Sequence, residues 1–239
     1  MQFIDTHIHL QDDKSNNATD IIARAQQVGC VKMICVSSTE TNWPQVALLC
    51  QNNPNNIVPA FGIHPWSVSD IREGWGTRLE EMIKQYPSAI IGECGLDGLK
   101  PLPEVQKNVF LSHCRLAKRH NRPLIVHAVK AQTELESLWQ ELPEKFVIHG
   151  YNSKPEFLKQ IIRHDGYIGL GSHILRHPQA KEIIGLIPLN KMLFETDAPY
   201  QASYPWAIKE QAEQIARLLN ISMEKLMEQV LKNSVEFIR

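Results

Sequence analysis

The chain lacks the features of a secreted or membrane-bound protein. No apolar run is long enough to span a bilayer, and no basic segment followed by an apolar one begins the sequence. The five cysteines are odd in number and form no Cys-x-x-Cys pair, which favours buried thiols in a reducing compartment over a disulfide framework. With a net charge of −1, nothing draws the whole molecule to nucleic acid or acidic lipid. We therefore expect a cytoplasmic protein with no membrane and no obligate protein partner.

Linkers and internal repeats are also missing. No Gly- or Pro-rich stretch and no low-complexity tract divides the chain. Its 239 residues, 43% of them apolar, are enough for one large core. The prediction is a single domain over residues 1–239.

What the sequence does contain is an alternation of short apolar runs and helical patterns. The first run, Phe3 to Leu10, is followed by a polar segment from Gln11 to Ser15, which is typical of a strand ending in a loop. Further strands are expected at 31–36, 57–64, 89–93, 124–127, 146–149, 167–171 and 192–197. Helices are expected at 18–29, 39–51, through 79–83, and at 103–121, near 135–138, 157–162, from 180, 206–219 and 222–237.

This order predicts an α/β fold with a parallel sheet covered by helices. Eight strand–helix units at this length favour a (β/α)8 TIM barrel over an open doubly wound sheet, which more often has five or six strands. In such a barrel, catalytic side chains project from the C-terminal ends of several strands.

Residues that can bind metals end five of the expected strands. His7 and His9 lie two apart in the first, so both imidazoles can point to one face. The other strand ends carry Glu93, His127, His149 and Asp197. Any one of these is explained as well by a capping or core polar residue, but the set as a whole predicts a metal site.

Four imidazoles and two carboxylates suffice for two divalent ions, which we expect to be Zn, Mg or Mn. Glu93 is suited to bridge them because a carboxylate has two oxygens. Two ions about 3.5–4 Å apart recur in enzymes that hydrolyse phosphate esters, where they activate water and stabilise the leaving oxygen. Asp197 is the candidate general base for that water.

The motifs that carry these residues resemble the TatD family of metal-dependent hydrolases, within the amidohydrolase-like superfamily. The resemblance runs nearly end to end through Asp5-Thr6-His7-Ile8-His9-Leu10, Gly62-Ile63-His64-Pro65, Gly92-Glu93-Cys94-Gly95-Leu96-Asp97, Pro123-Leu124-Ile125-Val126-His127, Ile148-His149-Gly150 and Glu195-Thr196-Asp197-Ala198-Pro199-Tyr200.

The resemblance implies two metal sites and a deoxyribonuclease activity of the 3′–5′ exonuclease type. One site would consist of His7, His9, Glu93 and Asp197, and the other of Glu93, His127 and His149. His64, in the Gly-x-His-Pro motif, would either face the substrate or serve a structural role before the proline.

The chain departs from the family pattern where the family binds its substrate. Val129 stands where the family usually has an arginine, and no arginine follows Tyr200 in the loop Gln201 to Pro205. Arginine grips phosphate oxygens two at a time, which lysine does only as a point charge. Lys130, Arg176 and His177 are candidates to compensate.

Three functions follow from these observations. The first is a dinuclear hydrolase of phosphodiesters, with DNA or a small phosphodiester as its substrate. The missing arginines favour a second, a metal-dependent hydrolase of a small ester, lactone or amide. The third is a non-catalytic metal-binding module, which the presence of the candidate base Asp197 disfavours.

Overall fold

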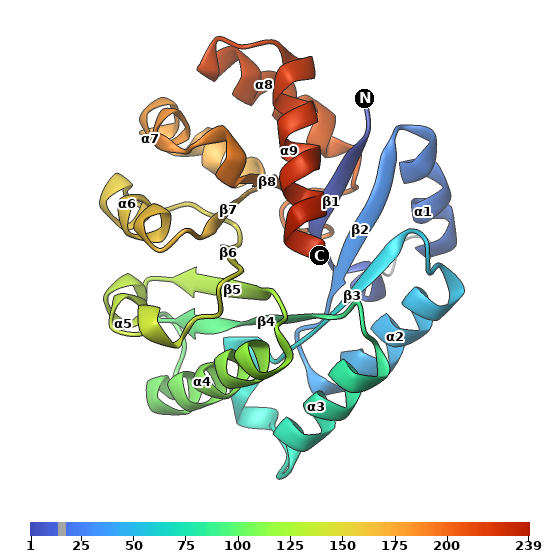
Figure 1. Ribbon diagram of the computed structural model, residues 1–239, viewed down its shortest axis with the longest axis vertical. Helices are drawn as coiled ribbons and strands as arrows, with labels where there is room; N and C mark the ends of the chain where they lie inside the picture. Colours follow the sequence, from blue (N-terminus) through green and yellow to red (C-terminus); the bar gives the residue numbers. More distant parts are fainter. Residues whose placement is uncertain (14–17) are drawn as a thin grey trace.

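Eight parallel strands in sequence order form the centre of the computed structural model, which describes residues 1–13 and 18–239. Lys14 and Ser15 of the predicted first loop therefore lie outside the described residues. The strands are β1 (Phe3–Ile8), β2 (Cys30–Val36), β3 (Ile57–Phe61), β4 (Ile90–Asp97), β5 (Leu124–Val129), β6 (Phe146–Ile148), β7 (Tyr167–Leu170) and β8 (Met192–Phe194). They form a ring surrounded by helices (Figure 1), which confirms the predicted (β/α)8 barrel.

Helices follow the strands and form the outer layer, except for the last helix, which follows another helix. They are α1 (Ala18–Gln27), α2 (Trp43–Asn52), α3 (Trp75–Gln85), α4 (Pro103–His120), α5 (Gln132–Glu136), α6 (Pro155–Arg163), α7 (Ala180–Leu186), α8 (Ala207–Leu219) and α9 (Met223–Ile238). Most of their buried residues join one large apolar cluster with the outward-facing strand residues. Because the sheet is apolar on both faces, its strands read as continuous apolar runs rather than as alternating ones.

A second, smaller apolar cluster fills the barrel interior. Ile34 and Val36 of β2 and Val58 and Ala60 of β3 contribute to it, and the spacing of two places each pair on one face of its strand. Phe237 of α9 joins the same cluster. Figure 1 shows α9 lying across the ring of strands, and Phe237 therefore closes one end of the interior.

β1 and β8 meet at the seam of the barrel, where an isolated parallel bridge joins Ile8 to Ala198. The backbone N–H of Asp197 donates to the His7 carbonyl oxygen at 2.8 Å, and that of His9 donates to the Ala198 carbonyl oxygen at 2.8 Å. Buried Asp5 accepts from the N–H of Thr196 at 3.0 Å. The seam therefore brings the first motif, Asp5 to Leu10, next to the last one, Glu195 to Tyr200.

Several predicted strand ends differ from the observed ones. The predicted strand 57–64 ends at Phe61, so His64 instead precedes the 3-10 helix η3 (Pro65–Asp70). The strand predicted to end at Glu93 continues to Asp97, with a register shift against β5 between Ile91 and Cys94. β8 ends at Phe194, three residues before Asp197. Pattern reasoning fails here because polar site residues interrupt the apolar runs within strands as well as at their ends.

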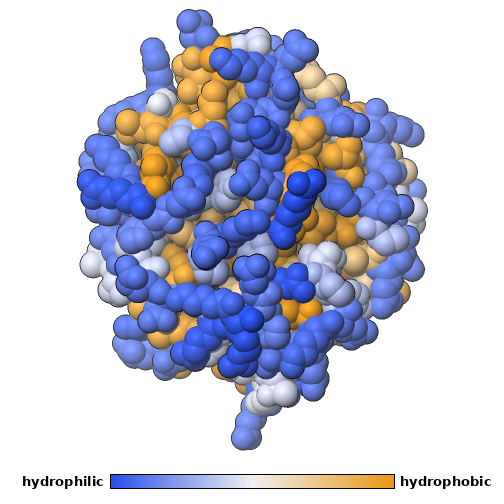
Figure 2. All heavy atoms as spheres, viewed as in Figure 1, coloured by the Kyte–Doolittle hydropathy of each residue, from blue (hydrophilic) through white to orange (hydrophobic). Residues whose placement is uncertain are grey.

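The outer surface is mostly polar. Figure 2 shows hydrophilic residues over most of the visible face, with apolar residues in patches between them. Among the residues that the structure describes, no helix combines the length and apolarity needed to cross a bilayer.

Candidate metal centre

The residues predicted from strand ends converge at the carboxyl ends of the strands. His7 lies in β1, Glu93 in β4 and His127 in β5, while His9, His149 and Asp197 lie just beyond β1, β6 and β8. All six residues are at most 9% exposed. The structure therefore brings together every residue of the predicted set, from five different strands.

The first group of donor atoms comes from the seam of the barrel. His7 Nε2 lies 3.1 Å from His9 Nε2, and His9 Nε2 lies 3.3 Å from Asp197 Oδ1. The third distance, from His7 Nε2 to Asp197 Oδ1, is 3.8 Å. Glu93 Oε2 approaches this group at 3.2 Å from His7 Nε2 and 3.7 Å from His9 Nε2.

The second group surrounds the other oxygen of Glu93. His149 Nε2 lies 2.9 Å and His127 Nδ1 3.0 Å from Glu93 Oε1. His64 belongs here too, because its Nε2 lies 3.3 Å from Glu93 Oε1 and 3.1 Å from His127 Nδ1. The sequence left open whether His64 faces the substrate or has a structural role. These contacts place its ring against Glu93 and His127 at the centre.

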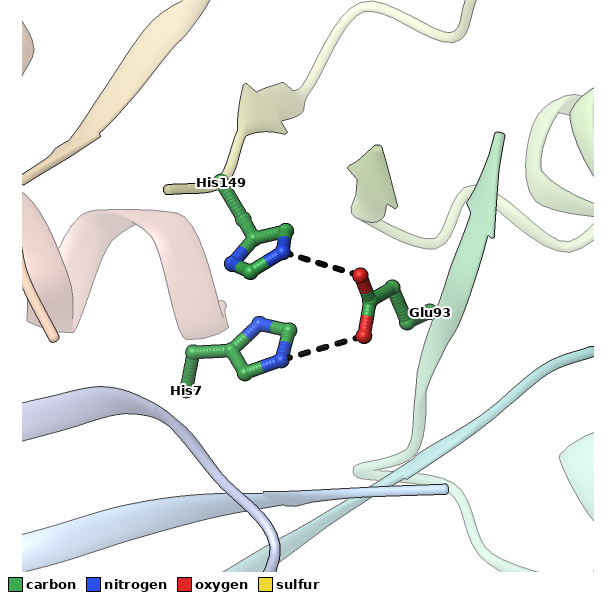
Figure 3. Close-up of side chains that lie close together, drawn as sticks. All are labelled: His7, Glu93 and His149. Atoms are coloured by element: carbon green, nitrogen blue, oxygen red, sulfur yellow. Dashed lines mark ion pairs between the residues drawn. The ribbon is translucent and has the colours of Figure 1, made fainter. Parts of the chain in front are cut away.

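Glu93 stands between the two groups and turns one oxygen toward each. Figure 3 shows His149 and His7 on the same side of the carboxylate, each opposite a different oxygen. The two rings stack with their centroids 3.9 Å apart. The two carboxylate oxygens of Glu93 therefore face different imidazole nitrogens.

Hydrogen bonds behind the imidazoles determine which nitrogen of each ring is left to face the centre. His9 Nδ1 lies 2.8 Å from the Val36 carbonyl oxygen, which can only accept, so Nδ1 donates to it and Nε2 is the nitrogen that faces the centre. His149 has the same arrangement, because its Nδ1 lies 3.2 Å from Glu195 Oε1. Such outer contacts are typical of histidines that bind metals.

His127 is turned the other way round. Its Nε2 lies 3.4 Å from Asp97 Oδ2, which leaves Nδ1 directed at Glu93. Asp97 is buried, and although burial alone would raise its pKa, hydrogen bonds from His127 and Trp66 hold that pKa below its ordinary value. His7 differs from the other rings, since its buried Nδ1 has no partner among the described residues.

The electrostatics of the centre favour positive charge between the carboxylates. Burial would raise the pKa of Glu93, but the neighbouring His149, His64 and His7 hold it well below its ordinary value. Burial would lower the pKa of His149, yet Glu93 and Glu195 raise it well above 6.5. Ionised carboxylates that draw positive charge into a buried site are the environment in which divalent cations bind.

The spacing of the donor atoms also suits a metal ion. Ligand atoms roughly 2.0–2.2 Å from a tetrahedral zinc ion lie roughly 3.3–3.6 Å from one another. Three groups have donor atoms that all lie within 4.8 Å of one another: His7, Glu93 and His149; His7, His9 and Asp197; and His64, Glu93 and His127. The donors are therefore spaced closely enough to share ions, although the groups cut across the predicted division into two sites.

A cavity of about 950 Å³ opens over this centre. His9, His64, Glu93, His127, His149 and Asp197 form part of its wall, together with Trp66, Lys130, Lys154, His173, His177 and Tyr200. Its size is at the upper end of the range for small-molecule sites. The described lining contains lysines but no arginine, so Lys130 and His177 of the predicted compensating residues reach the cavity and Arg176 does not.

Sequence reasoning missed the residues that orient the donors. Glu195 and Asp97 stand behind His149 and His127, and Gln201 Nε2 donates to Asp197 Oδ2 at 2.9 Å. Asp97 and Glu195 are the outer residues of two motifs described above, Gly92 to Asp97 and Glu195 to Tyr200. Their position in those motifs was the available signal.

A (β/α)8 barrel with histidines and carboxylates gathered at the carboxyl ends of its strands defines the class of metal-dependent barrel hydrolases. The sequence profile of the family described as TatD related DNase matches residues 4–239. The chain therefore belongs to this family. The prediction of a hydrolase acting on ester bonds is confirmed at that level.

Individual relatives agree with this assignment. The chain is 26% identical to human "Deoxyribonuclease TATDN3", over 98% of this chain and 93% of the relative. It is 28% identical to "3'-5' ssDNA/RNA exonuclease TatD" of Escherichia coli K12, over 76% and 72%. The crystal structure of YjjV, a TatD homologue of Escherichia coli K12, superposes with a TM-score of 0.91 at 24% identity, covering 98% of this chain and 97% of YjjV.

Proposed function

We propose that the chain is a dinuclear metal-dependent phosphodiesterase that removes nucleotides from the 3′ end of DNA. Its family, and relatives named as deoxyribonucleases, support this reaction. The observation that carries the dinuclear proposal is the position of Glu93, whose two oxygens each face a separate group of imidazoles at 2.9–3.7 Å.

Each candidate ligand has a role in this proposal. His7, His9, Glu93 and Asp197 hold one divalent ion. Glu93, His127 and His149 would hold the other, with His64 beside them. Divalent ions of the Zn, Mg or Mn type supply Lewis acidity here, which lowers the pKa of water toward neutrality and stabilises the charge that develops on phosphate oxygens.

Asp197 is the proposed general base. It is 9% exposed and lines the cavity, so it meets both the centre and incoming water. Burial would raise its pKa, but the hydrogen bond to His9 and the nearby His7 and His149 lower it to about 2. The carboxylate is therefore ionised at neutral pH, as a proton acceptor must be. Gln201 Nε2 holds its Oδ2 in place.

The cavity lining favours a second candidate substrate class. Because no arginine stands among the described lining residues, the cavity has no guanidinium with which to grip phosphate in a bidentate manner. Lys130 and Lys154 supply point charges, and Glu136 and Glu156 also line the cavity. Small phosphodiesters or esters are therefore the alternative to a DNA end.

Hydrolysis of labelled single-stranded DNA in the presence of Mg, Mn or Zn tests the proposal. We expect stepwise loss of 3′ nucleotides, abolished in His9→Ala and in Asp197→Ala with the circular dichroism spectrum unchanged. His120→Ala is the matched control, because His120 contacts Glu80 away from the cavity. Cleavage that survives both site variants would refute the assignment of the centre.

A parallel panel of small phosphodiesters and carboxylic esters separates the two substrate classes. Turnover of the small compounds without DNA cleavage would support the second. Tight metal binding without turnover of any substrate would support a non-catalytic module.

We also propose that residues 1–239 form one domain in the cytoplasm. A single sheet passes through all eight strands, and a single large apolar cluster packs the helices against it. All five cysteines are free thiols and buried, as suits a reducing compartment.

A further inference from the structure

Trp66 is an exposed aromatic side chain in the wall of the cavity. It follows His64 and Pro65 in η3, and 59% of its surface is accessible. Folding normally hides much of an indole, because it is the largest apolar side chain. The only other large exposed aromatic in the described lining is Tyr200, whose ring lies edge-on to His9.

The indole is held in one orientation although it is exposed. Its Nε1 donates to Asp97 Oδ2 at 2.6 Å, and its backbone N–H donates to His64 Nδ1 at 3.1 Å. Lys100 Nζ lies 4.3 Å from the ring centroid and covers one face. Lys100 is not among the described residues of the cavity wall, whereas Trp66 is.

Trp66 is also close to the reacting centre. The His64 ring lies perpendicular to the indole with centroids 5.1 Å apart, and His64 Nε2 is 3.3 Å from Glu93 Oε1. One imidazole therefore separates the indole from the bridging carboxylate. A planar group attached to a phosphate at the centre would come within reach of the exposed indole in the cavity wall.

We propose that Trp66 is the stacking surface that binds a nucleobase, or an equivalent planar ring, next to the scissile phosphate. This inference rests on the proposed function. Because the described cavity lining has no arginine, Trp66 would supply the contact that binds the substrate. Stacking on an aromatic ring tolerates every base, because each base has a π face. The recognition expected is therefore of a nucleotide without regard to its sequence.

Two substrates that differ only in the terminal base test this inference. One is a short DNA strand ending in thymidine, and the other ends in an abasic sugar. We expect wild type to prefer the thymidine end, and Trp66→Leu to reduce the ratio of the two kcat/KM values by roughly 10- to 100-fold, mainly through KM. Trp66→Phe keeps a ring but loses the hydrogen bond to Asp97, so it should retain most of the preference.

Trp206→Leu is the matched control. Trp206 also has a cation 4.3 Å over its ring, from Arg24, but it does not line the cavity. We expect the ratio to stay at its wild-type value in this variant. An unchanged ratio in Trp66→Leu would overturn the inference. So would equal losses in Trp66→Leu and Trp66→Phe, since the bond to Asp97 would then explain the effect.

A binding measurement separates this inference from the proposed function. Thymidine monophosphate added to the metal-loaded protein should quench tryptophan fluorescence in wild type and in Trp206→Leu, and not in Trp66→Phe. If no strand is cleaved and this quenching is still seen, the phosphodiesterase proposal fails and the stacking site stands. Equal quenching in wild type and Trp66→Phe would refute the stacking site, whatever the activity.

Discussion

Replacing Glu195 by Gln should weaken metal binding without removing any proposed ligand. Glu195 is 1% exposed and follows β8. Its Oε1 faces His149 Nδ1 at 3.2 Å and also accepts from the backbone N–H of Gly150. The carboxylate therefore fixes the protonated nitrogen of His149 and turns the opposite nitrogen toward Glu93.

The amide keeps the shape of the side chain but removes its charge. A neutral partner makes the His149 ring less basic. The amide also has one acceptor oxygen where the carboxylate has two, so an amide that rotates by 180° presents its NH2 group to His149 Nδ1. Loss of such an outer contact typically lowers metal affinity about 10- to 100-fold, which corresponds to about 1.4–2.7 kcal/mol. We expect a loss in this range at the group formed by Glu93, His127 and His149.

Calorimetric titration of chelator-stripped protein with Zn or Mn measures this loss. Glu213→Gln is the control, because Glu213 is exposed and pairs only with Arg217 on α8. The melting temperature of the stripped proteins shows whether the fold is intact. An affinity in Glu195→Gln equal to that of wild type, with both proteins folded, would refute the claim that Glu195 positions His149.

Three further predictions concern stability. In the first, the free metal is present at 100 times its dissociation constant and is then removed with a chelator. The free energy of unfolding should fall by about 2.7 kcal/mol and the melting temperature by about 5–10 °C, and adding Zn should restore both. An unchanged melting temperature would contradict metal binding by the folded centre. The second concerns buried His113. Burial lowers its pKa to about 4, although its hydrogen bond to the Val109 carbonyl oxygen acts in the opposite direction. The unfolded chain therefore binds the proton first, so the stability present above pH 6.5 is lost as the pH falls toward 4, by about 2 kcal/mol at pH 5. Between pH 7 and pH 5, the loss of stability measured by urea unfolding should be larger in wild type than in His113→Gln by about 2 kcal/mol. Gly95→Ala should lower the free energy of unfolding by at least about 2 kcal/mol, because a Cβ would lie 2.0 Å from the His127 carbonyl oxygen at a φ of +146°, whereas Gly185→Ala, with nothing within 4 Å, should not destabilise.

The architecture could be predicted because parallel barrel strands are buried on both faces. Runs such as residues 30–36 are buried or nearly so along their whole length, and a short continuous apolar run identifies them. The helices were recognised from the spacing of their buried residues, as in α1, where Ile21, Ile22 and Ala25 face the sheet. The single-domain assignment stays a prediction.

Strand ends were harder to predict than strand positions. His64 looked like the end of a strand because Pro65 follows it, but the ladder between β3 and β4 stops at Phe61. Glu93 looked like a strand end because a charge in a buried strand is costly unless it is paired. Here it is paired, since the imidazoles of five described histidines lie around its carboxylate, and the strand continues to Asp97.

The donors of the centre and the residues that orient them differ in how visible they are in a sequence. A donor such as His149 stands out locally, as a polar residue that ends an apolar run. Its partner Glu195 lies 46 residues away, and only the fold brings the two together. The same holds for His127 and Asp97, which lie 30 residues apart on neighbouring strands.

Trp66 contacts residues of both kinds. It touches Asp97, which orients His127, and it lies against His64, which contacts Glu93. A ring in this position meets the substrate on one side and the hydrogen bonds of the centre on the other. Substrate stacked on Trp66 would therefore be positioned against the same side chains that are proposed to hold the ions. Because the described cavity lining has no arginine, this contact would position a phosphate by its attached base rather than by bidentate contacts to its oxygens.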